Sequence, residues 1–443
     1  MPTVIVAGGG LAGLAAAAAL GQAGFEVDVF EARGFLGGRA TSYPVPTGTP
    51  DETAETIDNC QHVLLRCCVN LLDFYRRLGV ADRIQFHKTF YFMEPGGRTS
   101  VFEAGGLPAP LHFAGSFWDL KFLDARDKIA SARAMWALRS EHRTRGDLDQ
   151  ISMLDWLREK GQTDRAIARF WNQVLVSAVN EDLDQMAASH GFQVFWLGFL
   201  VQADSYEMGV PAIPLGDLYN LEVWNRVPNV RVHARAAVER VEIENGAVRG
   251  VVVGGEKRTA DFYVSALPVE RIGAVIPELG VKTAEFAHSP ITGIHLWFDR
   301  SVTDLPHATL LDRTIQWMFN KSDGRYVQLV VSASRNLVEM PRAEVIALAV
   351  RELAEFFPAV AEAKLEKAHV VKEIRATVSA RPGLEAARPE STTAFPNLFL
   401  AGDWTRSGWP PTMEGAVRSG YLASEALARA AGRDASFLIP DIG

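Results

Sequence analysis

The stretch TVIVAGGGLAGLAAAAALGQAGFEVDVFEAR, residues 3–33, decides the fold. Its first five residues are short, apolar and mostly β-branched, which predicts a buried strand. The Ala- and Leu-rich run that follows predicts a helix ended by Gly24, and residues 26–32 predict a second strand. Strand, helix and strand in this order form a βαβ unit of a doubly wound α/β sheet.

The first turn of this unit carries a glycine pattern. Gly8, Gly10 and Gly13 follow the G-x-G-x-x-G spacing. Gly8 permits a tight turn, Gly10 lets a pyrophosphate approach the backbone, and Gly13 lets the helix pack closely on the strand. Leu11 and Ala12 begin the helix, where free N–H groups and the helix dipole attract phosphate.

The end of the second strand carries an acid. Glu31 stands where a carboxylate accepts hydrogen bonds from a ribose, and Ala32 and Arg33 follow it directly. A glycine-rich turn without a ligand would not need this acid. The sequence therefore predicts dinucleotide binding.

The next segment, EARGFLGGRA (31–40), separates the two common dinucleotides. Its Gly37-Gly38-Arg39 run, followed by Ala40, resembles the second glycine pair of the FAD-dependent amine oxidase and phytoene desaturase superfamily. The resemblance implies FAD rather than NAD. Arg39 would neutralise pyrophosphate charge, and the glycines would let the chain pass under the cofactor.

The far end of the chain agrees with this resemblance. NLFLAGDWTRSGWPPTMEGAVRSGYLASEAL (397–427) reads as a buried strand, a loop and a helix from about Thr412, like the superfamily's C-terminal flavin motif. The helix start would stabilise negative charge on a reduced flavin. No cysteine follows Cys68, so we expect noncovalent FAD. The residues that the resemblance places at the cofactor here are Gly402, Asp403, Thr412, Met413, Glu414 and Ala416.

A third cofactor segment is expected at 229–268, which reads as four short strands. The resemblance places Val238 over the adenine and Ala266, in the strand VSALP, beneath the dinucleotide. A helix is expected just before, over 213–227. The fold class is thus α/β: a Rossmann-type (GR2-like) FAD domain from discontinuous segments plus an α+β substrate domain. We expect the FAD domain to comprise 1–79, 206–275 and 376–443, and the substrate domain 80–205 and 276–375.

The segment IDNCQHVLLRCC (57–68) offers a carboxylate, a histidine and three cysteines within a dozen positions. The cysteines lack the C-x-x-C spacing of a metal site, and Cys67 and Cys68 read as helical, so their side chains would diverge. Free cysteines are usually small buried hydrophobes, which disfavours a catalytic thiol. We expect no metal. In the superfamily this segment is the loop over the flavin, which places Asn59, Gln61 and His62 near the ring.

The longer stretch DNCQHVLLRCCVNLLDFYRRLGV (58–80) resembles bacterial hydroxysqualene dehydroxylases, formerly called squalene-associated FAD-dependent desaturases. It departs from that family at Cys60, Arg66 and Cys68. The resemblance implies that hydroxysqualene loses its allylic hydroxyl and gains a hydride, giving squalene, in squalene and hopanoid synthesis. The substrate would be a long apolar isoprenoid, and no motif identifies an electron donor.

That reaction needs one acid in an apolar tunnel, because losing water from a protonated hydroxyl leaves an allylic cation. Asp58 and His62 are the candidates, with Tyr206 or Glu207 behind them. Asp58 is equally suited to capping the next helix, and His62 to hydrogen-bonding the flavin or the backbone.

Three rival functions stay open. A carotenoid-type desaturase would run the flavin oxidatively on a similar polyene. An amine oxidase would typically carry a lysine in the strand matching ITGIHLWF (291–298), and none occurs there. A flavin-binding structural subunit would catalyse nothing.

Composition restricts the location and the partners. The net charge of −8 argues against nucleic-acid binding, and three clustered cysteines favour a reducing compartment. No signal peptide and no apolar run of the ~20 residues of a membrane span is visible, so we expect a cytoplasmic protein. Segment 107–123, followed by many basic residues, is either a solvated surface or a peripheral contact with the inner face of the cytoplasmic membrane. The wedge of that contact would be Phe113, Phe117, Trp118 and Phe122.

Overall fold

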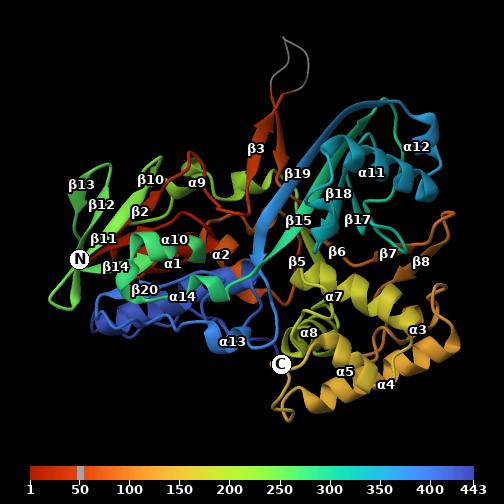
Figure 1. Ribbon diagram of the computed structural model, residues 1–443, viewed down its shortest axis with the longest axis horizontal. Coiled ribbons are helices and arrows are strands. Elements are labelled where there is room, and N and C mark those ends of the chain that lie inside the picture. Colours follow the sequence, from red (N-terminus) through yellow and green to blue (C-terminus); the bar gives the residue numbers. More distant parts are fainter. Residues whose placement is uncertain (47–53) are drawn as a thin grey trace.

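A computed structural model describes residues 1–46 and 54–443. A parallel five-stranded sheet fills the left of Figure 1 and brings segments from both ends of the chain together. Its order is β10–β2–β1–β14–β20, with bounds β1 Thr3–Ala7, β2 Glu26–Glu31, β10 Val230–Ala234, β14 Phe262–Ser265 and β20 Leu398–Leu400. This sheet and the helix after β1 confirm the predicted Rossmann-type fold class.

Two helices from opposite ends of the chain pack against each other beside this sheet: α1 (Leu11–Gln22) and α14 (Met413–Ala430). Residues Leu11 to Gly21 are all buried, which explains why α1 is apolar on every side. A Cβ on Gly420 would lie 2.3 Å from the Ala12 carbonyl oxygen, so glycine permits this close helix contact. The helix of the N-terminal βαβ unit is therefore covered by the last helix of the chain.

Residues 229–268 form five strands rather than the predicted four. The first of the five, β10, joins the parallel sheet. The others are β11 Val238–Glu244, β12 Ala247–Val253, β13 Glu256–Arg258 and β14. The single helix expected over 213–227 is wrong. The chain forms a 3-10 turn at Leu215–Leu218 and the short α9 (Leu221–Trp224), because the side chain of Asn220 caps a new start by accepting from the N–H groups of Glu222 and Val223.

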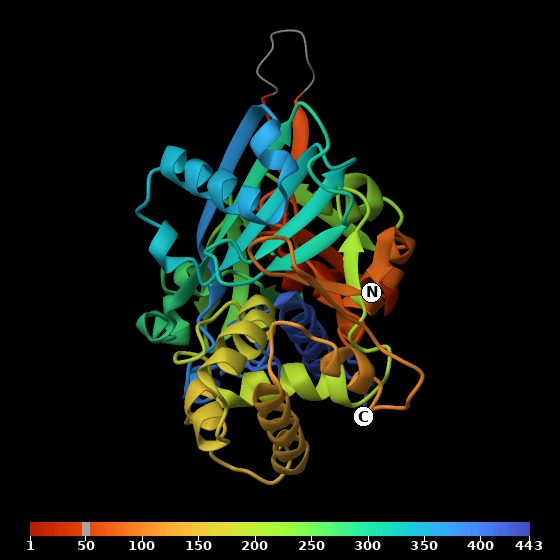
Figure 2. The same ribbon diagram turned by 90° about the vertical axis from the view of Figure 1, so that its right-hand side faces the viewer.

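A seven-stranded mixed sheet forms the second half of the molecule (Figures 1 and 2). Its order is β19–β15–β18–β17–β16–β7–β8, with bounds β7 Phe90–Met93, β8 Thr99–Phe102, β15 His288–Phe298, β16 His307–Leu310, β17 Trp317–Ser322, β18 Tyr326–Ser332 and β19 Leu365–Val378. The long β15 and β19 run between the two halves in Figure 1. The exact domain boundaries stay a prediction.

Alternation along the strands gives this sheet two different faces. Ile294, Leu296, Leu329 and their neighbours of the same parity pack against α11 (Arg342–Phe356) in one apolar cluster. Residues of the other parity, such as Trp317, Phe319 and Val330, face a helical layer and a cavity. That layer and its surroundings hold α3 Ala114–Trp118, α4 Ala125–Glu141, α5 Met153–Glu159, α6 Asp164–Ala166, α7 Asn172–Val179 and α8 Ala188–Phe195.

Two small sheets lie between the halves. β3 (Ser42–Val45) pairs with β4 (Glu55–Asp58), and β9 lies between β5 and β6. Their bounds are β5 Leu64–Leu65, β6 Ile84–His87 and β9 Met208–Pro211. The remaining helices are α2 Val69–Arg77, α10 Val269–Val275, α12 Ala359–Glu362 and α13 Leu384–Ala387. Among the described residues, no helix has the length and apolarity needed to cross a membrane.

Candidate active site

The turn after β1 has a steric reason for two of its glycines. Gly8 has φ +111°, and a Cβ there would lie 2.7 Å from the Ala266 carbonyl oxygen. A Cβ on Gly13 would lie 2.0 Å from the Gly8 carbonyl oxygen, closer than any real contact. The turn is thus as tight as the sequence predicted, and Ala266 lies directly beside it.

Gly10 has no such reason within the protein, and this tests whether a dinucleotide fits. The nearest atom that a Cβ on Gly10 would meet is the Gly38 Cα, 3.9 Å away. The open space beside Gly10 lies at the start of α1, where phosphate is favoured. The second glycine run closes on the same turn, since the Gly37 N–H donates to the Gly9 carbonyl oxygen at 2.8 Å. The arrangement fits a pyrophosphate.

Glu31 is buried at the end of β2 and holds this turn together. Its carboxylate accepts from the Gly9 N–H at 2.7 Å and from the Arg33 N–H at 2.8 Å. The Arg33 guanidinium donates to the Gly38 carbonyl oxygen at 3.2 Å. Glu31 is therefore already oriented by backbone donors, as a ribose-binding carboxylate must be.

Arg39 and Asp403, far apart in the sequence, form an ion pair with a nitrogen–oxygen distance of 2.5 Å. Desolvation acts to lower the pKa of Arg39, but pairing with Asp403 outweighs it and raises that pKa. Gly402 has φ +143° because the Trp404 ring occupies the space of a Cβ. Arg39 and Asp403, which were both expected at the cofactor phosphates or ribityl chain, thus lie in contact with each other.

The start of α14 presents unpaired N–H groups. Thr412 caps the helix, because its hydroxyl oxygen accepts from the Gly415 N–H at 3.3 Å. The N–H groups of Met413 and Glu414 precede the first intrahelical bond and have no acceptor among the described residues. They are the groups that the resemblance assigns to the flavin ring.

The Glu414 side chain turns away to another helix. Its carboxylate accepts from Asn70 N–H at 3.2 Å, Asn70 Nδ2 at 2.9 Å and Leu71 N–H at 2.6 Å. Burial raises its pKa to about 7, against the opposing effect of these donors. Glu414 thus caps α2 from outside. Because this cap fixes the helix start at Val69, the helical prediction for Cys67 and Cys68 is wrong.

The loop before α2 crosses the seven-stranded sheet closely. A Cβ on Gly293 would lie 2.9 Å from the Asn59 carbonyl oxygen, so no lysine side chain fits there without moving the loop. The Asn59 carboxamide donates to the Arg39 carbonyl oxygen at 2.9 Å and to Glu373 Oε1 at 3.1 Å. Asn59 therefore fixes the loop.

Asp58 does not cap α2. Its carboxylate accepts from the Ser42 hydroxyl at 2.6 Å and from the Leu215 N–H at 2.8 Å, and it lies 3.5 Å from Lys321 Nζ. Lys321 also donates to Gln61 Oε1 at 2.8 Å. Asp58 is not among the residues that line the cavity. Sequence reasoning missed Lys321, whose only signal is its alternation with Trp317 and Phe319 along β17.

His62 lies in the cavity wall with one ring nitrogen engaged. Its Nδ1 is 2.9 Å from the Cys60 carbonyl oxygen, which can only accept, so Nδ1 carries the proton. Nε2 of the neutral ring is then an acceptor. Burial lowers the pKa of His62, while the charge of Asp58 acts in the opposite direction.

The cavity has a volume of about 260 Å³ and lies between the loop, the start of α14 and the face of the seven-stranded sheet. Its wall is mainly aromatic and aliphatic, with polar groups at the end that α14 and the loop share and others along α7, such as Gln173 and Ser177. Residues that line it include Cys60, Gln61, His62, Phe90, Phe92, Phe102, Gln173, Phe199, Trp317, Phe319, Val330, Thr412, Met413 and Glu414. The cavity brings the predicted loop residues and the predicted helix start together.

Other predicted residues lie elsewhere. The Tyr206 hydroxyl donates to the Lys88 carbonyl oxygen at 2.8 Å, and Glu207 pairs with Arg66 and Lys88; neither residue lines the cavity. Val238 starts β11 and is buried against the parallel sheet. Ala40 and Ala416 lie in the core around α1.

The cysteines do not form a metal site. Among the described residues, no group of three or more His, Cys, Asp or Glu side chains is placed to hold a metal ion. Burial raises the pKa of Cys60 to about 12, so this thiol stays protonated. A thiolate nucleophile has no support here.

The cavity-facing side of the seven-stranded sheet also holds buried polar groups that sequence reasoning missed. His307, Phe319, Gln328 and His295 stand opposite one another on four consecutive strands, and Thr309 follows on the same face. His295 Nε2, both ring nitrogens of His307 and both amide atoms of Gln328 have no partner among the described residues. These side chains are at most 1% exposed.

The fold and site together define a dinucleotide-binding flavoenzyme with an apolar substrate cavity. A model of the flavin-containing amine oxidoreductase family matches residues 11–428. The chain belongs to this family and is an FAD-dependent oxidoreductase.

Named relatives are carotenoid desaturases. The chain is similar to the zeta-carotene desaturase of Synechocystis sp., at 24% identity over 478 residues that cover 96% of each protein. It is also similar to the 15-cis-phytoene desaturase of Solanum lycopersicum, at 25% identity over 96% of this chain and 77% of the relative.

Solved structures share the fold. Putrescine oxidase bound to putrescine superposes with a TM-score of 0.71 at 14% identity, over 97% of this chain and 98% of the oxidase. Cyclohexylamine oxidase from Brevibacterium oxydans gives a TM-score of 0.69 at 17% identity, over 98% and 100%.

Proposed function

We propose that the protein desaturates a long apolar isoprenoid, removing two hydrogens from adjacent carbon atoms. The observation that carries the proposal is the aromatic-lined cavity whose polar end is formed by His62 and the start of α14. The zeta-carotene and phytoene desaturases support the substrate class, because the similarity covers almost the whole chain. Bound FAD supplies a hydride acceptor.

His62 takes the second hydrogen as a proton. Its Nδ1–H is held by the Cys60 carbonyl oxygen, so Nε2 is free to accept. The lowered pKa keeps the ring neutral at neutral pH, as a base requires. Loss of a hydride and a proton from neighbouring carbons leaves the new double bond, so the step balances. The apolar wall holds the chain and excludes water.

The test is turnover of defined polyenes by the purified, FAD-loaded protein with an added quinone that reoxidises the reduced flavin. Phytoene and zeta-carotene in detergent should gain conjugation, read as absorbance at longer wavelength and as a loss of two hydrogens by mass spectrometry. His62→Phe should keep its flavin and lose about 10²- to 10⁴-fold in turnover. His87→Phe, outside the cavity lining, is the matched control and should keep turnover. A flavin-loaded protein that desaturates neither polyene contradicts the proposal.

A second candidate function is reductive removal of the hydroxyl of hydroxysqualene. One observation favours it: the Gln173 side chain lines the cavity, is 7% exposed, and its Oε1 has no partner among the described residues. Such an acceptor in an apolar wall suits a substrate hydroxyl. The lowered pKa of His62 opposes it, because this reaction needs a proton donor. Squalene formed from hydroxysqualene by the chemically reduced protein without oxygen would select this function.

A further inference from the structure

Helices α3 and α4 lie at one edge of the molecule, at the lower right of Figure 1. These helices and the loop before them carry exposed apolar side chains. Trp118 is 57% exposed and Trp136 is 70% exposed. Leu107, Leu111 and Ile129 are also exposed. The wedge expected from the sequence is wrong in part, since Phe113 and Phe122 are buried and stay in the core. Large exposed aromatic groups in one region mark an interaction surface.

The outer side of α4 carries only basic and uncharged residues. Arg126, Ile129, Arg133 and Trp136 are exposed at steps of three and four residues, which places them on one stripe. Arg139 and Arg143 extend the stripe. In the part of the chain that the structure describes, none of these four arginines takes part in an ion pair. We call this stripe, together with Trp118 beside Lys128 of the same helix, the α4 face.

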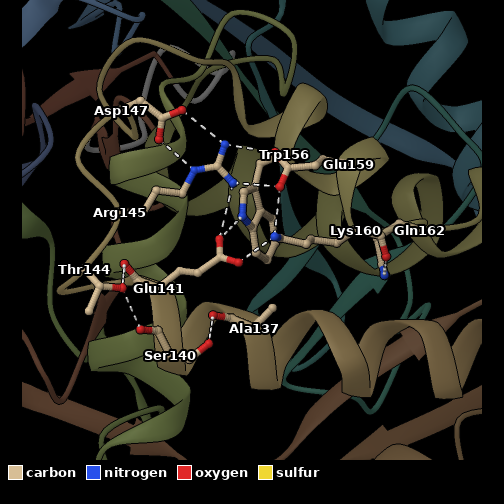
Figure 3. A network of polar contacts seen from close by, with 10 residues as sticks. All are labelled: Ala137, Ser140, Glu141, Thr144, Arg145, Asp147, Trp156, Glu159, Lys160 and Gln162. Atoms are coloured by element: carbon tan, nitrogen blue, oxygen red, sulfur yellow. Dashed lines mark hydrogen bonds and ion pairs between the residues drawn. The ribbon is translucent and has the colours of Figure 1, made fainter.

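The acidic residues of α4 point elsewhere. Asp127 is buried and completes a capping box with Asp124 at the helix start. Glu141 pairs with Arg145 and Lys160 and accepts from Trp156 Nε1 at 2.9 Å, a network that ties α4 to α5 (Figure 3). Two exposed acids, Asp119 and Asp124, precede the helix, and Asp124 pairs with Arg165. The positive stripe is therefore not neutralised along its length.

Cations lie beside the exposed rings. Arg139 Cζ is 5.8 Å from the Trp136 ring centre, and Lys128 Nζ is 5.6 Å from that of Trp118. Tryptophan beside arginine or lysine is the pairing that lies at the boundary between lipid headgroups and acyl chains. An acidic protein partner would match the charges of this surface. It would leave the large exposed apolar side chains without an apolar environment, which a bilayer provides.

We propose that the α4 face docks the protein on an anionic phospholipid bilayer. The net charge of −8 means that the acidic excess lies on other surfaces, which would turn away from such a bilayer. Phe113 lies behind the α4 face and stacks on Phe102 with ring centres 4.3 Å apart, and its ring is 5.9 Å from that of Phe199. Phe102 and Phe199 line the cavity. Buried aromatic side chains thus pack between this surface and the cavity, and supply of the cavity's apolar substrate from the bilayer rests on the proposed function.

The experiment is flotation of the full-length, FAD-loaded protein with vesicles. Vesicles of phosphatidylcholine containing phosphatidylglycerol should bind it at low salt, and vesicles of phosphatidylcholine alone should bind it far less. Arg133→Glu with Arg139→Glu should weaken binding at least about thirtyfold, the equivalent of about 1 kcal/mol for each cation removed. The matched control is Arg226→Glu with Arg249→Glu, which changes the net charge equally at exposed sites of the other half and should bind normally.

The apolar part has its own variant. Trp136→Ser with Ile129→Ser should also lower binding, whereas Leu221→Ser, equally exposed elsewhere, should not. Thermal melting and flavin absorbance show that each variant folds. If the two arginine pairs weaken binding equally, net charge rather than this face is responsible and the proposal is wrong. A wild-type protein that floats with neither kind of vesicle also overturns it. Because flotation needs no turnover, a failed desaturation assay leaves this result unaffected.

Discussion

The parallel sheet and the seven-stranded sheet bury their faces in opposite ways. Against α1 and α14, the parallel sheet is covered by small apolar residues in backbone-close contact, as at Gly13 and Gly420. The cavity-facing side of the seven-stranded sheet buries His295, His307 and Gln328 with polar atoms that have no hydrogen-bond partner in the part of the chain that the structure describes. The first arrangement maximises packing, whereas the second keeps hydrogen-bonding capacity that packing alone would not retain. Close packing thus defines the cofactor half by its shape, whereas the substrate half buries polar groups that its own packing does not require.

The strongest way to break the shape-specified half is Gly13→Ala. Its Cβ would lie 2.0 Å from the Gly8 carbonyl oxygen, so we expect a loss of at least about 4 kcal/mol of stability and flavin-free or insoluble protein. Gly10→Ala meets no protein atom within 3.9 Å and should cost at most about 1 kcal/mol while weakening FAD binding. Denaturant unfolding of the apoprotein and flavin titration measure both. Equal stability of the two variants would contradict the inference that packing within the protein requires Gly13 and that the cofactor requires Gly10.

Next comes the contact between α14 and α2 within the cofactor half, tested by Glu414→Ala. The change leaves the buried N–H groups of Asn70 and Leu71 without an acceptor, and Asn70 Nδ2 keeps only the Ile439 carbonyl oxygen, which together should cost about 3 kcal/mol or more. Glu425→Ala, in the same helix but near its exposed end, should cost less. Urea unfolding gives both values. A loss under about 1 kcal/mol in Glu414→Ala would show that α2 does not depend on this cap.

The buried histidines of the substrate half should make the free energy of unfolding depend on pH under acidic conditions. Burial lowers the pKa of His307 to about 3, below the ordinary 6.5, so below pH 6.5 the unfolded chain binds a proton that the folded chain refuses. This stabilising contribution is complete above pH 6.5 and is lost as the pH falls, at about 1.4 kcal/mol per pH unit. The slope of unfolding free energy against pH should decrease by about that amount in His307→Leu. Thr309→Val, in the same face but without a titrating group, should keep the wild-type slope.

The smallest expected effect is a gain. Gln328→Met removes two buried amide atoms that have no partner within residues 1–46 and 54–443, and it should stabilise the protein by about 1 kcal/mol. Gln316→Met should do the reverse, because Gln316 exchanges two hydrogen bonds with Ser332. Thermal melting with a matched heating rate compares them. If Gln328→Met destabilises as much as Gln316→Met, the polar face is an ordinary hydrogen-bonded core.

The sequence predicts what is local or motif-borne. The βαβ unit, the position of Glu31 and the start of α14 near Thr412 follow from residues that are neighbours in the chain. The resemblance placed Arg39 and Asp403 at one cofactor, but the ion pair between them was not predicted. Gly10 was predicted to make room for the cofactor rather than for another part of the protein, and the open space beside it agrees with this prediction.

The rest depends on contacts between distant segments. Cys67 and Cys68 read as helical because their apolar surroundings continue into α2, but the helix start is fixed by Glu414, more than 340 residues away. The row through His307, Gln328 and His295 exists only through the register of four strands. Lys321 reaches Gln61 across the same sheet. Neither spacing nor composition determines such registers.

The pairing of the first helix with the last has a consequence for synthesis. Helix α1 is buried along its whole length, partly by α14 and beside β20, which leave the ribosome last. At about 5–20 residues per second, this apolar segment waits roughly 20–80 s for its cover. During that interval the nascent chain exposes a Leu- and Ala-rich surface with nothing native to meet it. Production in a cell should therefore depend on chaperones of the trigger factor or Hsp70 class, which bind the N-terminal segment until translation ends.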